Sequence, residues 1–65
     1  MNKEETYMTE KYNSVLLSQS QTAEVLGISK DTVLDLIKSG DLVPVMVGKS
    51  KKFNINDLAK YMRGE

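Results

Sequence analysis

Two short helical patterns separated by only three residues constrain this chain more than any other feature. Ser18-Gln19-Ser20-Gln21 has the Ser-x-x-Gln spacing of a capping box, and Gly27 stands where this first helix should end. Gly27-Ile28-Ser29 is long enough only for a turn, and Ser29 is the expected N-cap of a second helix that ends at Ser39-Gly40. The pattern predicts either a helix-turn-helix or a plain helical hairpin.

The two expected helices have complementary apolar faces. In the first, Ala23 is small enough for another helix to approach closely, and in the second Val33, Leu36 and Ile37 recur at helical spacing. These faces should pack together. The opposite face of the second helix displays Lys30, Asp31, Asp35 and Lys38, with Leu34 at its border.

A β-hairpin is expected next. Val45-Met46-Val47 and Phe53-Asn54-Ile55 alternate as short strands, and Gly48-Lys49-Ser50-Lys51-Lys52 between them reads as a turn with three lysines at its tip. A basic hairpin beside a helix-turn-helix is a wing, whereas an isolated one is only a solvated turn. Lysines suit phosphate contacts because an ammonium group needs only proximity to an anion.

The two ends of the chain complete the predicted organisation. Asn56 is expected to cap a last helix in which Leu58, Tyr61 and Met62 recur at helical spacing and close the core. Residues 1–13 are polar and lack periodicity, so we predict a flexible N-terminal arm, either unstructured or able to reach a partner or a DNA groove. The predicted fold is α+β: a small winged helix-turn-helix over residues 14–65, with two short helices, a β-hairpin wing and a C-terminal helix.

Composition excludes most catalytic chemistry. With no cysteine and no histidine, the chain has no disulfide, no thiolate or imidazole metal ligand and no histidine acid or base. Its carboxylates are scattered over exposed helix faces and caps. We therefore expect no enzyme, no cofactor and no metal site.

Charge and hydropathy give two further expectations. The formal net charge is zero, but five basic residues face two acidic ones from residue 49 onward, so the C-terminal part is the basic one. No apolar run approaches the roughly 20 residues that span a bilayer, and the N-terminus does not look like a signal peptide. We expect a cytoplasmic, nucleoid-associated protein.

These segments together resemble the excisionase-type group of MerR-like winged helix-turn-helix domains over residues 15–62. The resemblance is carried by Leu17-Ser18, Ala23-Glu24-Val25-Leu26-Gly27-Ile28-Ser29-Lys30-Asp31-Thr32-Val33, Leu36-Ile37-Lys38-Ser39-Gly40-Asp41-Leu42, Val47-Gly48-Lys49 and Phe53-Asn54-Ile55-Asn56-Asp57-Leu58-Ala59-Lys60-Tyr61.

The resemblance implies a DNA-binding surface. It would be formed by the second helix (Ser29, Lys30, Asp31, Thr32, Leu34, Asp35 and Lys38) and by the wing (Lys49, Ser50, Lys51 and Lys52). Two features depart from the group. Asp35 stands where such domains often carry Arg or Lys, so it either accepts a hydrogen bond from cytosine or weakens binding. The expected turn is also about two residues longer than usual.

The function that the resemblance implies is sequence-specific DNA binding. The first expectation is an excisionase, or recombination directionality factor, that binds double-stranded DNA cooperatively beside neighbouring copies, bends it and works with a site-specific recombinase (integrase). A small transcriptional regulator, or a protein-interaction module that binds a recombinase or repressor, is the alternative. One short module with no heptad left over should be a monomer in free solution.

Overall fold

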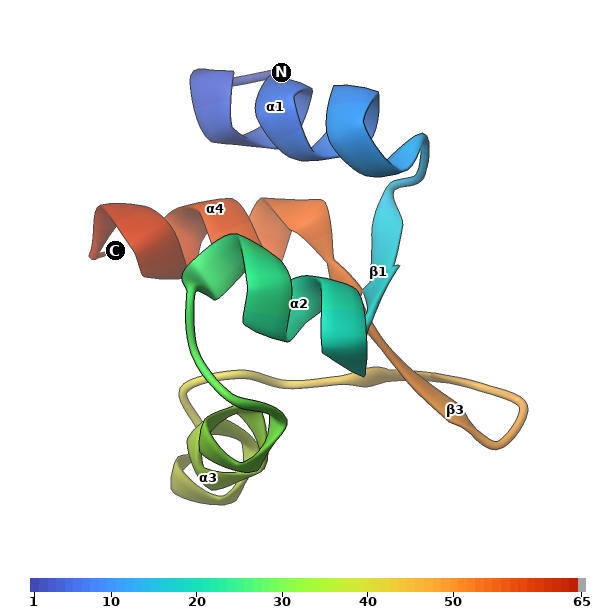
Figure 1. Ribbon diagram of the computed structural model, residues 1–65, viewed down its shortest axis with the longest axis vertical. Coiled ribbons are helices and arrows are strands. Elements are labelled where there is room, and N and C mark those ends of the chain that lie inside the picture. The colour runs from blue at the N-terminus through green and yellow to red at the C-terminus, as the bar shows by residue number, and fades with distance from the viewer. Residues whose placement is uncertain (65) are drawn as a thin grey trace.

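The computed structural model describes residues 1–64, which form four helices and one three-stranded antiparallel sheet (Figure 1). The described elements are α1 (Lys3–Tyr12), β1 (Leu16–Ser18), α2 (Gln19–Leu26), α3 (Lys30–Ser39), β2 (Val45–Val47), β3 (Ser50–Asn54) and α4 (Ile55–Arg63). This architecture, with the helix-turn-helix α2–α3 followed by a hairpin and a helix, confirms the predicted α+β winged helix-turn-helix.

The helix-turn-helix has the predicted end signals. The Ser18 hydroxyl accepts the Gln21 N–H at 3.1 Å, and the Gln21 side chain accepts the Ser18 N–H at 3.0 Å, which completes the capping box. Ser29 caps α3 by accepting the Thr32 N–H at 3.1 Å. Gly27 has a φ of +70°, a left-handed conformation that ends α2 and lets the chain turn into α3.

The sheet has the order β1-β3-β2, and its hairpin turn is shorter than expected. Val47 pairs with Ser50, so only Gly48 and Lys49 form the turn, and Gly48 has the positive φ that the first residue of a tight hairpin turn requires. The predicted five-residue turn is wrong. Because backbone pairing continues to the tip, Lys51 and Lys52 belong to β3 and only Lys49 lies in the turn.

Helix α4 begins one residue after β3, earlier than the sequence suggests. Asn54, not Asn56, is its N-cap, and the Asn54 side chain accepts the Asn56 N–H at 2.7 Å. Ile55 is therefore helical, and the buried stripe of α4 consists of Ile55, Leu58 and Ala59. The expectation that Tyr61 and Met62 close the core is wrong: these side chains are 39% and 38% exposed, because the first two turns of α4 already fill the core.

The N-terminal segment is a helix and not a flexible arm. Asn2 and Glu5 form a capping box at the start of α1, with the Glu5 N–H to Asn2 Oδ1 distance at 2.8 Å, and Asn13 ends the helix in a left-handed conformation. Met8 is fully buried. The prediction of an arm over residues 1–13 fails because a single apolar anchor leaves little periodicity in the sequence, while the caps and the contact with α4 stabilise the helix.

Polar contacts attach α1 to the rest of the fold. The Asn56 side-chain amide donates to Glu5 at 2.8 Å, Arg63 lies 3.7 Å from Glu4, and the Tyr12 hydroxyl donates to Glu24 of α2. The Tyr12 hydrogen bond, followed by the charge of nearby Lys11, lowers the pKa of the Glu24 carboxyl. Burial, followed by the same hydrogen bond, raises the pKa of the Tyr12 hydroxyl.

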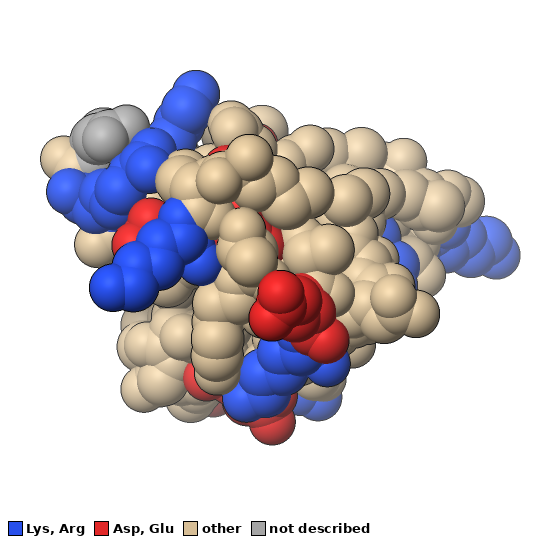
Figure 2. Space-filling model, turned by 90° about the horizontal axis from the view of Figure 1, so that it is seen from above, with Lys and Arg blue, Asp and Glu red and all other residues tan. Residues whose placement is uncertain are grey.

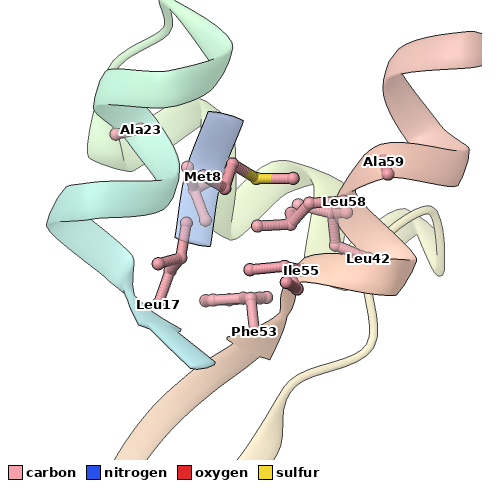
Figure 3. Close-up of a cluster of buried hydrophobic side chains, with 9 residues drawn as sticks. Met8, Leu17, Ala23, Leu42, Phe53, Ile55, Leu58 and Ala59 are labelled. Atoms are coloured by element: carbon pink, nitrogen blue, oxygen red, sulfur yellow. The ribbon is translucent and has the colours of Figure 1, made fainter. Parts of the chain in front are cut away.

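The core lies where the four helices meet the sheet (Figure 3). Leu17 of β1 lies opposite Phe53 of β3 in the strand pairing, and both are buried. The remaining buried apolar residues are Met8, Ala23, Val33, Leu42, Ile55, Leu58 and Ala59. The predicted core positions Ala23, Val33 and Leu58 are confirmed, and the burial of Val33 sets how α3 is presented to solvent.

Candidate nucleic-acid interface

Helix α3 presents nearly all of the predicted recognition residues to solvent. Val33 is buried and Leu36 and Ile37 pack against the core, which turns the opposite face outward. On that face Leu34 is half-buried. Ser29, Lys30, Asp31, Thr32, Asp35 and Lys38 are exposed. The face therefore combines two cations, two carboxylates and two hydroxyls on one short helix.

The first turn of α3 is held by its own side chains. The Ser29 and Thr32 hydroxyls lie 2.9 Å apart, and Ser29 also accepts the Thr32 N–H. Gln19, the first residue of α2, donates its side-chain amide to the Lys30 carbonyl at 3.5 Å. Its contact with α3 depends on the helix-turn-helix geometry and has no local sequence signal.

The wing displays its basic residues along the hairpin. Lys49 lies in the turn, Ser50 and Lys51 are exposed in β3, and Lys52 is half-buried. Because side chains alternate between the two faces of a strand, Lys51 and Lys52 point to opposite faces. The wing is thus a basic strand and tip, and not the compact cluster of three lysines that the sequence suggested.

The structure brings α3 and the wing to the same side of the molecule. In Figure 1 both lie below the core, and α1 lies on the opposite side above α4. This is the arrangement in which a recognition helix enters a major groove while the neighbouring hairpin meets the DNA backbone. The geometry of the two predicted surfaces is therefore mutually consistent.

The charge pairs that involve α1 lie away from this surface. Lys11 is 3.7 Å from Glu24 and Arg63 is 3.7 Å from Glu4, and both pairs involve α1. Figure 2 looks down on α1 and shows basic and acidic groups side by side there, with further basic groups at the projecting hairpin. Within residues 1–64 no ion pair engages Lys30, Lys38 or the wing lysines, so their charges stay available to an external anion.

The described part of the chain has neither a cluster of metal-binding side chains nor a membrane-spanning helix. Among residues 1–64, no group of three or more acidic, histidine or cysteine side chains is placed to hold a metal ion. No helix within that range is long and apolar enough to cross a bilayer.

Comparison with known proteins agrees with this geometry. The family model described as a helix-turn-helix domain matches residues 16–65. Proteins described as uncharacterized from Mycobacterium bovis and from two strains of Mycobacterium tuberculosis are 38% identical over 48 residues, which is 74% of this chain and 42% of theirs. The match therefore spans less than half of those relatives. No solved structure matches this chain.

Proposed function

Because this chain belongs to the helix-turn-helix domain family, we propose that it is a sequence-specific DNA-binding protein, acting as an excisionase-like factor that binds cooperatively and bends DNA. The observation that carries the proposal is the placement of an exposed, polar α3 face and a basic wing on one side of a rigid core. Double-stranded DNA is the partner, and a site-specific recombinase would act on the DNA so arranged. Such a protein works at the nucleoid.

The two surfaces have different roles in this proposal. Lys30, Thr32 and Asp35 face base edges, with Asp35 as an acceptor for a cytosine amino group, while Ser29 chiefly holds the helix start. Asp31, Leu34 and Lys38 complete the helix surface. Lys49, Ser50, Lys51 and Lys52 contact phosphates, which position the protein without reading sequence.

The expected interface area and number of phosphate contacts favour several bound copies over one tightly bound monomer. A module of this size buries only about 600 to 1,000 Å² of protein surface on DNA. With about four to six phosphate contacts, the logarithmic salt slope would be about −4 to −5. Such a domain gains useful occupancy from adjacent copies, whose added contacts must offset a bending cost of about 1 to 6 kcal/mol.

A mobility shift at two salt concentrations tests DNA binding, with footprinting of the DNA that flanks its gene to locate the site. Replacing Lys49, Lys51 and Lys52 with Ala should weaken binding to all sequences alike and reduce the salt slope by about one per lost contact. Lys3→Ala, on exposed α1, is the matched control. A triple variant that binds as tightly as the parent would remove the wing from the interface.

Base readout needs a separate test. Lys30→Ala should cost about 1 to 3 kcal/mol on the preferred site and much less on random DNA, whereas Asp35→Arg should strengthen nonspecific binding. Equal losses on both DNAs would make Lys30 a phosphate contact only. On repeated sites the shift should be steep and the circular-permutation mobility altered. A single-site, non-cooperative shift on unbent DNA would favour a small transcriptional regulator, and no shift at all a protein-interaction module.

A further inference from the structure

An apolar groove lies between the turn that joins α2 to α3 and the last turn of α4. It has a volume of about 550 Å³ and is lined chiefly by Val25, Leu26, Ile28, Leu36, Tyr61 and Met62. Tyr61 and Met62 were expected in the core, yet more than a third of each side chain is exposed. A 65-residue domain that leaves these side chains open while burying few others has an apolar surface that its own fold does not cover.

A second apolar surface lies on the outer strand of the wing. Val45, Met46 and Val47 are 41%, 56% and 49% exposed, and β2 has a neighbouring strand only on its β3 side. Figure 1 shows the β2–β3 hairpin projecting from one end of the molecule and the C-terminal end of α4, which borders the groove, at the other. Each copy therefore carries a recess and an apolar projection at opposite ends.

We propose that the groove of one copy receives β2 of the next copy, with the Met46 side chain as the anchor. A projection and a recess at different places on one chain generate a head-to-tail contact, which does not close on itself and extends into a row. Met46 suits the role because a flexible thioether side chain adapts to an irregular recess. Thr32 at the start of α3 also lines the groove, whereas Asp31, Asp35 and Lys38 lie outside it and stay uncovered in every copy.

Charge favours the same pairing. Tyr61 also lines a neighbouring hollow with Asp41, Asp57 and Lys60, so the border of the groove carries two carboxylates and one ammonium group. On the wing, Met46 lies opposite Lys51 and Val45 lies opposite Lys52 in the strand pairing. Because cross-strand partners share one face of a sheet, Lys51 accompanies Met46 to a border with an excess of acid and leaves Lys49 and Lys52 for DNA phosphates, whereas two grooves brought face to face would meet with like charges.

The contact is small, and this determines when it forms. One three-residue strand in one groove falls below the roughly 800 Å² per partner of stable complexes, so free copies should remain monomeric. In its cooperative role the inference rests on the proposed function, because DNA that holds copies side by side supplies the effective concentration that a weak contact needs.

The absence of cysteine from the sequence makes a direct test possible. Met46→Cys and Met62→Cys are made as separate full-length variants, one of them labelled with ¹⁵N, then mixed and treated with a short bismaleimide. In an equal mixture at high protein concentration without DNA, we expect the mixed Met46→Cys and Met62→Cys product to exceed the sum of the two products of like variants, which it would only equal by random collision. Added DNA with repeated sites should increase it by about tenfold or more.

Glu10→Cys, at an exposed α1 position outside both surfaces, is paired with Met46→Cys as the matched control and should give only the background of random collision. A dominant product between two Met62→Cys copies would show a symmetric dimer and overturn the proposal, as would a mixed product no greater than the control. The cross-linking reaction without DNA tests the contact between copies independently of DNA binding. If the parent protein gives no mobility shift, that result refutes only the proposed DNA-binding function.

Discussion

Helices α1 and α4 contact each other and have similar lengths, yet their sequences differ sharply. Helix α4 buries Ile55, Leu58 and Ala59 along one stripe, whereas α1 buries only Met8. Both begin at an asparagine cap and end at a left-handed residue. The comparison shows that a helix in a small domain can be specified by an apolar stripe, or by caps and a single anchor on a neighbour that is already in place.

The buried stripe of α4 stabilises the whole domain, whereas the buried anchor of α1 only holds that helix in place. Loss of the α4 stripe should unfold the domain, because that stripe contacts the sheet and the helices around it. Loss of the α1 anchor should release α1 while residues 16–64 remain folded. A chain of this length has a free energy of unfolding of only about 3 to 10 kcal/mol, so either change should be measurable.

The largest effect is expected at the centre of the α4 stripe. Leu58→Ala should lower the free energy of unfolding by about 3 to 5 kcal/mol, because Leu58 is fully buried and its neighbours cannot fill the cavity. Urea denaturation followed by circular dichroism measures this loss. Lys60→Ala, exposed on the same helix, should change stability by no more than about 0.5 kcal/mol. Equal effects of the two substitutions would contradict the assigned core face.

A smaller and more local effect is expected at the α1 anchor. Met8→Ala should cost about 2 kcal/mol and accelerate amide hydrogen exchange in residues 3–12 far more than in α2 or α3. Thr6→Ala, at an exposed position of the same helix, serves as the control. Uniform acceleration over the whole domain would show instead that α1 and the helix-turn-helix unfold as one unit.

The caps should contribute less than the anchors. Asn2→Ala removes the acceptor for the Glu5 N–H and should cost about 1 kcal/mol, with fraying limited to α1. Asn2→Asp keeps an acceptor in place and should retain most of the stability. Thermal unfolding of the parent, Asn2→Ala and Asn2→Asp measures the order of their stabilities. If Asn2→Ala matches the parent, the anchor alone holds α1.

The smallest effect concerns pH. Backbone hydrogen bonding at Asn2, then the Asn56 amide, lowers the pKa of the Glu5 carboxyl, and the Tyr12 hydroxyl does the same for Glu24. Each lowered pKa contributes stability that is present above pH 4.5 and is lost as the pH falls through the folded-state value. Exchange in α1 should therefore rise in acid before exchange in α4 does.

Matched variants locate the source of this pH effect. Glu5→Gln and Glu24→Gln together should reduce the pH dependence, whereas Glu10→Gln, at an exposed α1 position, should not. If the acid-induced loosening persists unchanged in the double variant, other carboxyls hold α1 in place.

Short-range chemistry explains what could be predicted. Ser18, Gly27, Ser29 and Gly40 act within one helical turn of their own positions, so the helix-turn-helix was visible as a pattern. The same local rule misplaced the start of α4 by two residues, because Asn54 and Asn56 are both good caps and only the pairing of β3 with β1 decides between them. The predicted wing turn was too long for a similar reason: Ser50, Lys51 and Lys52 pair with β2 only once the two strands are aligned.

The amino-acid sequence by itself determined the ends of α2 and α3, the apolar face of α3, the basic character of the wing and the absence of thiol and imidazole chemistry, because each depends on residue type and near neighbours. The tertiary structure alone decided that α1 packs on α4 through Met8, that Gln19 contacts the start of α3, and that Tyr61 and Met62 border an open groove. These outcomes depend on contacts between residues distant in sequence. The helix or strand propensity of a residue does not show which surfaces of the fold are already covered by other elements.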